Sequence, residues 1–131
     1  MSQARGQALV ELAVCMPLVL LLGLGTAGVV EVADASSGLR AATEAALAVA
    51  ARAPDRAAAE AAAHSRFAAV ISAYQVKSPI LRLVDGGFVR GATLTALSTG
   101  FVDLGWEAVT PARLAIEADA SMRIDPWRTR W

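Results

Sequence analysis

A single carboxylate, Glu11, lies at the start of the longest uncharged stretch in this chain. The stretch runs from Leu12 to Val30 and ends at a second acid, Glu31. A charged carboxylate at the edge of an apolar environment is costly unless a cation neutralises it. Glu11 therefore needs either a cation or exposure to water at this boundary.

The other reactive side chains form no recognisable catalytic or metal-binding set. His64 and Cys15 are the only residues of their types, and Glu117 and Asp119 share a face of an expected strand, where solvated acids are common. The sequence has no phosphate-binding glycine loop, zinc-ligand spacing or Ser/His/Asp triad. We therefore expect a protein that is not an enzyme, with no catalytic residue, cofactor, metal or small-molecule substrate.

The composition points away from nucleic acid and toward a membrane. The chain has 12 basic and 12 acidic residues, a formal net charge of +0 and no block of like charge, so no nucleic-acid partner is expected. Its apolar fraction of 56% is high for a soluble protein. Its 131 residues suit one small domain with one additional element.

The 19 uncharged residues 12–30 are long enough to cross a membrane. As a helix they span about 28 Å, close to the hydrocarbon thickness of a bilayer. Pro17 is expected to kink this helix or to leave a carbonyl unpaired. Three small residues, Gly23, Gly25 and Gly28, allow other helices to approach closely. This combination favours a helix that packs with others over a lone lipid-facing anchor.

The flanking charges predict an orientation in the cytoplasmic membrane. Arg5 precedes the span, whereas Glu31 and Asp34 follow it, so the N-terminus is expected inside and the bulk of the chain outside. Glu31 and Asp34 are either an ordinary interfacial charge pair or a subunit contact. The alternative is a signal peptide cleaved after Ala35, although the apolar run exceeds the roughly 7–15 residues of a signal core.

The residues around Glu11 form a pattern with a known counterpart. A short polar leader ends at Gly6, Glu11 follows five residues later, and an apolar helix comes next, which resembles a type IV pilin-like precursor. Residues 5–53 resemble the TadE-like family of the tight-adherence (Tad) pilus. The matching features are the Gly-x-Ala-x-Val-Glu-like start, Pro17, Glu31 just beyond the span and the Arg/Ala-rich continuation.

The resemblance implies cleavage by a prepilin peptidase between Gly6 and Gln7, with the peptidase, membrane lipid and other pilin or pseudopilin subunits as partners. It also implies that Glu11 pairs with the freed terminal ammonium of a neighbouring subunit and sets axial register. The other interpretation of Glu11 is a plain interfacial acid. Two differences, Gln7 in place of an aromatic residue and Leu12 in place of the Tyr of major Tad subunits, fit a minor pilin or pseudopilin better.

The predicted fold class is α+β, divided into a leader (1–6), a long helix (7–53, with its span at about 12–30) and an extracytoplasmic domain (54–131). Asp55 is expected to cap a second helix at about 56–74. The apolar line of that helix should pack on a small antiparallel sheet of three to four strands; this line contains Phe67, Val70, Ile71 and Tyr74.

Alternating apolar residues predict the strands of that sheet. We expect strands at 80–84 and 88–97, a turn at Ser98–Gly100, and a one-sided strand at 114–124. Residues 101–109 fit either a strand or an ordered loop. The C-terminal Trp127 and Trp131 have no assigned role. Besides a pilus-assembly subunit, the pattern also permits a single-pass envelope protein whose outer domain binds a partner while the helix only anchors it.

Overall fold

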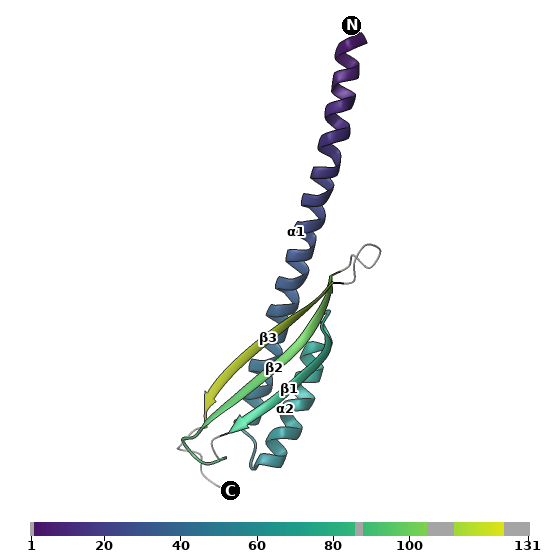
Figure 1. The fold of residues 1–131 in the computed structure, drawn as a ribbon. Helices are drawn as coiled ribbons and strands as arrows, with labels where there is room; N and C mark the ends of the chain where they lie inside the picture. The colour runs from purple at the N-terminus through teal and green to yellow at the C-terminus, as the bar shows by residue number, and fades with distance from the viewer. Residues whose placement is uncertain (1, 86–87, 105–111, 125–131) are drawn as a thin grey trace.

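A computed structural model of the chain describes residues 2–85, 88–104 and 112–124. Two helices are followed by three strands: α1 (Ser2–Ala50), α2 (Arg56–Ile71), β1 (Lys77–Asp85), β2 (Thr93–Leu104) and β3 (Ala112–Arg123). The strands form one antiparallel sheet in the order β1-β2-β3. The predicted α+β fold, with a long apolar helix, a second helix and a small antiparallel sheet, is confirmed. Figure 1 shows the first part of α1 projecting away from the other elements.

The second part of α1 is the central element of the folded domain. The helix runs without interruption through Pro17 and through Ser36–Gly38, where the sequence suggests a weak point. Small and branched residues recur on it every three or four positions and are fully buried. These residues are Ala35, Leu39, Ala42, Thr43, Ala46, Leu47 and Ala50. This spacing places them on one helix face, which forms the centre of the core.

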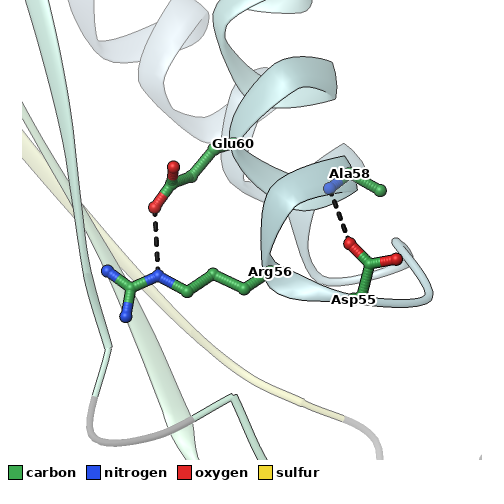
Figure 2. A network of polar contacts seen from close by, with 4 residues as sticks. All are labelled: Asp55, Arg56, Ala58 and Glu60. Atoms are coloured by element: carbon green, nitrogen blue, oxygen red, sulfur yellow. Dashed lines mark hydrogen bonds and ion pairs between the residues drawn. The ribbon is translucent and has the colours of Figure 1, made fainter.

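The N-terminus of α2 is stabilised by two local polar contacts (Figure 2). Asp55 is the N-cap, as predicted, and its Oδ1 accepts a hydrogen bond of 2.8 Å from the amide of Ala58. Arg56 and Glu60, one turn apart, form an exposed ion pair of 3.1 Å. The cap satisfies a backbone donor that the first helical turn leaves unpaired. The helix ends at Ile71, so Tyr74 lies just beyond it.

The packing partner of α2 differs from the prediction. The second helix packs mainly along α1 and makes a smaller contact with β1 of the sheet, while α1 itself covers β2 and β3. Its buried residues are Ala59, Ala63, Phe67 and Ile71. Both helices present alanine at their buried positions, which allows the two axes to approach closely. The predicted apolar face is therefore correct, but its main partner is a helix.

The predicted turn at Ser98–Gly100 is wrong, because β2 continues straight through it to Leu104. The hydroxyl of Ser98 lies 2.6 Å from Thr43 Oγ1 and also reaches the carbonyl of Ala118 at 3.2 Å. Gly100 is buried, and Val76 occupies the space that a side chain there would need. Both turn-forming residues instead serve the packing of a strand. Residues 101–104 belong to β2, and the rest of 101–109 lies outside the described residues.

The other strand boundaries shift by a few residues. The second strand begins at Thr93, later than position 88, because the chain turns through Gly91 at a φ of 76°. The strand predicted at 114–124 is β3, and its inward residue Ile116 is buried while Glu117 and Asp119 face outward. One side of the sheet is thus covered mainly by α1, and no described helix or strand packs on the other side.

Candidate functional site

The most distinctive surface of the molecule is the projecting part of α1, Gly6–Ala27, which we call the free segment. Every residue in it is exposed. At about 1.5 Å per residue it extends roughly 33 Å beyond the folded domain. Among the described residues, one helix is long and apolar enough to cross a membrane, and the free segment is its first part.

Large hydrophobic side chains cover the free segment on all sides. Each is between 49% and 67% exposed, and they are Leu9, Val10, Leu12, Val14, Met16, Leu18, Val19, Leu20, Leu21, Leu22 and Leu24. Residues 18–22 are five consecutive apolar positions, which at 3.6 residues per turn surround the helix completely. A helix that is apolar all round belongs inside a membrane or among other helices.

Glu11 is the only charged residue of the free segment. Its side chain is exposed, and within the described part of the chain it has no ion-pair partner. Gln7 lies one turn earlier, so it shares a helix face with Glu11. Among the described side chains, the free segment therefore presents one carboxylate in an apolar surface with no cation beside it.

The glycines of the free segment are open to other molecules. A Cβ atom added at Gly6, Gly23 or Gly25 would meet no other atom within 4 Å. Gly23 and Gly25 are about 160° apart around the helix axis, since each residue turns it by about 100°. They therefore open two opposite helix faces to close approach.

Gly28, Glu31 and Asp34 lie at the junction of the free segment with the folded domain. A Cβ at Gly28 would contact Cδ2 of Leu104 at 3.8 Å, so the end of β2 reaches this level of α1. Glu31 is half-buried and Asp34 is exposed, and neither forms an ion pair with another described residue. Immediately after them, Ala35 is 1% exposed and begins the core.

The open side of the sheet is a second surface, which sequence reasoning did not identify. Ile80, Val84, Leu97 and Phe101 lie on it and remain exposed. A signal exists in β2, where apolar residues occupy both odd and even positions, so both sides of the strand are partly apolar. By contrast, His64 and Cys15 are isolated and exposed, and the described residues contain no group of three metal-ligating side chains.

Comparison of the chain with protein-family models, with curated proteins and with solved structures gives no match.

Proposed function

We propose that this chain is a TadE-like minor pilin or pseudopilin that takes part in initiating or assembling a Tad-type pilus. The observation that carries the proposal is the free segment, an apolar rod about 33 Å long with one carboxylate near its start. A long N-terminal apolar helix packed on a small α+β domain is a pilin-like architecture. The role is structural rather than enzymatic.

In the proposed cycle the free segment has two successive environments. It first crosses the cytoplasmic membrane, with the N-terminus inside and the α+β domain outside. It then leaves the lipid and packs among the helices of other subunits in an extracellular pilus. The opposite placement of Gly23 and Gly25 supports this second state, because a helix inside a filament has neighbours on more than one side.

Glu11 provides specificity in an otherwise non-directional apolar contact. After cleavage between Gly6 and Gln7, each mature subunit has a terminal ammonium one helical turn from its own Glu11. In the filament, the ammonium of a neighbour neutralises the carboxylate of Glu11 in an environment from which water is excluded. Apolar packing alone tolerates sliding of one helix along another, whereas this pair favours one axial position.

The processing step gives the primary test of the proposal. We expect the protein purified from the membranes of its native host to begin at Gln7, as measured by mass spectrometry of the N-terminal peptide. Gly6→Val should block this cleavage and leave the leader attached. The matched control, Ser2→Val, changes a leader residue away from the cleaved bond and should leave processing intact. A chain that keeps Met1 or Ser2 at its start would contradict processing.

Glu11→Ala is expected to spare membrane insertion but to reduce assembly. Removing one partner of a buried ion pair costs about 3 kcal/mol, and a tenfold change corresponds to about 1.4 kcal/mol. Pilus yield counted by electron microscopy should therefore fall about a hundredfold. The control is Glu44→Ala, which removes an exposed acid from the folded part of the same helix. Normal piliation with Glu11→Ala would refute the ion-pair role.

Two other functions lead to different outcomes. If α1 only anchors an outer domain that binds a partner, replacing residues 12–30 with an unrelated membrane span should preserve function, whereas the pilin role requires that it be lost. If residues 1–35 are a signal peptide, the mature protein begins at Ser36. That cleavage would cut α1 directly after the buried Ala35, within the helix that forms the core.

A further inference from the structure

The side of the sheet that faces away from α1, which we call the outer face, has an ordered pattern of side chains. Pairing of the three strands places Arg82, Leu97 and Asp119 in one row across β1, β2 and β3. Ile80, Thr99 and Glu117 form the next row. The apolar members are substantially exposed: Ile80 55%, Val84 49%, Leu97 43% and Phe101 39%.

Charges of opposite sign lie on opposite edges of the outer face. Arg82 is on β1, whereas Glu117 and Asp119 are on β3. In the described part of the chain none of the three has an ion-pair partner. Within a row the two edges are about 9.5 Å apart, which is two strand spacings, and Leu97 lies between them. The face therefore has a positive edge, an apolar centre and a negative edge.

Two of the other charges near this surface have partners, whereas Lys77 on β1, opposite Phe101, has no ion-pair partner among the described residues and adds to the positive edge. Arg113 Nε donates to Asp103 Oδ1 at 2.9 Å, across β2 and β3. Arg123 Nε donates to the carbonyl oxygen of Gly91 at 3.0 Å. Among the described residues, both central rows therefore keep unmatched charges, and these rows lie where another molecule would pack on the face.

We propose that a second copy of this chain packs on the outer face, sheet against sheet, around a two-fold axis that runs along β2. Such a rotation exchanges the two edges of the sheet. Arg82 of each copy then lies opposite Asp119 of the other, and the two Leu97 side chains meet on the axis. The pattern of the face is thus complementary to itself, as an isologous interface requires.

The direction of α1 agrees with this axis. A Cβ at Gly28 would lie against Leu104, and Thr43 is hydrogen-bonded to Ser98. The earlier position on α1 therefore lies beside the later position on β2, so the two elements are antiparallel. Between these contacts the helix rises about 22 Å and the strand about 20 Å, so the two run side by side. In Figure 1 the strands lie obliquely beside the lower part of α1. A two-fold axis along β2 leaves both free segments pointing the same way, as one membrane requires.

The alternative two-fold axis runs across the strands, and it satisfies neither the charge pattern nor the common direction of the free segments. It would place Arg82 opposite Arg82 and Asp119 opposite Asp119, which is repulsive. It would also direct the two free segments to opposite ends of the dimer. Charge and membrane geometry therefore select the same arrangement from independent observations.

The dimer is expected to be weak and to depend on confinement in the membrane. Three strands at about 4.8 Å and eight residues at about 3.3 Å give a face of roughly 380 Å² in projection. A stable interface buries about 800 Å² per partner, so the face alone gives modest affinity. Anchoring both copies in one membrane raises their effective concentration. The proposal does not depend on pilus assembly.

The membrane helices would not touch in this dimer. Two packed sheets lie about 10 Å apart, and each α1 lies about 10 Å behind its own sheet, so the α1 axes are about 30 Å apart. Contact through the outer face is therefore distinguishable from contact through the free segments. Cys15 reports on the free segment, and a cysteine at position 97 reports on the sheet.

Cross-linking of the full chain tests the arrangement. The chain is reconstituted at low density in vesicles of phosphatidylethanolamine and phosphatidylglycerol and treated with a bismaleimide spanning about 10 Å, the spacing of packed sheets. With Cys15→Ser as background, Leu97→Cys should give about tenfold more cross-linked dimer than Ser65→Cys, an exposed control on α2. Equal yields at the two positions, or no dimer at 97, would overturn the proposal.

Charge reversal in the Leu97→Cys background tests the register. Arg82→Glu alone and Asp119→Arg alone should each lower dimer yield about tenfold, because each places like charges opposite one another. The double variant should restore the yield, since it exchanges the two edges. Arg66→Glu, an exposed reversal on α2, should have no effect. Failure of the double variant to restore the dimer refutes the two-fold arrangement.

Cross-linking in the native membrane shows whether a second copy or a different protein binds the outer face. In membranes of the host, the adduct at position 97 should have twice the mass of the chain and should contain only its peptides. An adduct with a different protein assigns the outer face to that partner and overturns the second copy. The unmodified chain can be cross-linked only through Cys15. If it gives a dimer while Leu97→Cys in the Cys15→Ser background gives none, the copies associate by their free segments, and the outer-face dimer is overturned.

Discussion

A chain shortened to residues 28–131 is expected to move entirely from the membrane to the soluble fraction while keeping its folded domain. The free segment is exposed throughout and contributes nothing to the core, which begins at Ala35. Its ten Leu and Val residues favour the membrane by about −0.3 to −0.6 kcal/mol each, or roughly −3 to −6 kcal/mol together. Carbonate extraction followed by sedimentation measures the redistribution, and circular dichroism measures the fold.

The matched control retains the full length of the helix. Leu20→Lys combined with Leu21→Lys adds two charges at the centre of the span, each costing about 2.5–3.5 kcal/mol there. This variant should leave the membrane as the shortened chain does. If the shortened chain unfolds, residues 6–27 belong to the folded domain. If it stays in the membrane, a different surface mediates membrane attachment.

Gly38→Ala is expected to destabilise the domain by about 2 kcal/mol, although alanine is the better helix former by about 1 kcal/mol. Gly38 lies in the buried part of α1 under the ring of Tyr74. A methyl group there would overlap ring atoms Cγ and Cδ1 at the base of the side chain, so the whole ring would have to shift. Urea unfolding in a mild detergent, followed by near-ultraviolet circular dichroism, measures the loss.

Removal of the Tyr74 ring should reverse the effect of Gly38→Ala. In a Tyr74→Ala background the methyl group has room, and only the gain in helix propensity remains. Gly23→Ala is the control, since nothing lies within 4 Å of a Cβ at that position. Equal destabilisation by Gly38→Ala in both backgrounds would show that the ring is not the cause.

The candidate site on α1 could be predicted from the sequence because its signals are local. The uncharged run from Leu12 to Val30, the glycines within it and the position of Glu11 are all features of consecutive residues. The same is true of the Asp55 cap, because its hydrogen bond reaches only to Ala58. Local hydrogen bonding and periodicity operate over one or two turns of chain, and a sequence displays them directly.

The outer face could not be predicted in the same way. Its rows exist only because β1 and β3 pair with β2 in one register, which brings Arg82 and Asp119 to either side of Leu97. A shift of one residue in either pairing would send every side chain of that strand to the other side. Alternation in a single strand does not determine which strands are neighbours.

By itself, the sequence determined the apolar rod, the carboxylate near its start, the helix cap and the strand alternation, since each depends on residues a few positions apart. Tertiary structure decided the rest. It packed the ring of Tyr74 against Gly38 and placed α2 on α1. It also put Ser98, an expected turn residue, in a strand, where its hydroxyl forms a hydrogen bond with Thr43, 55 positions away. Glycine and serine suit turns and close packing equally well, and only contacts between distant segments select between these uses.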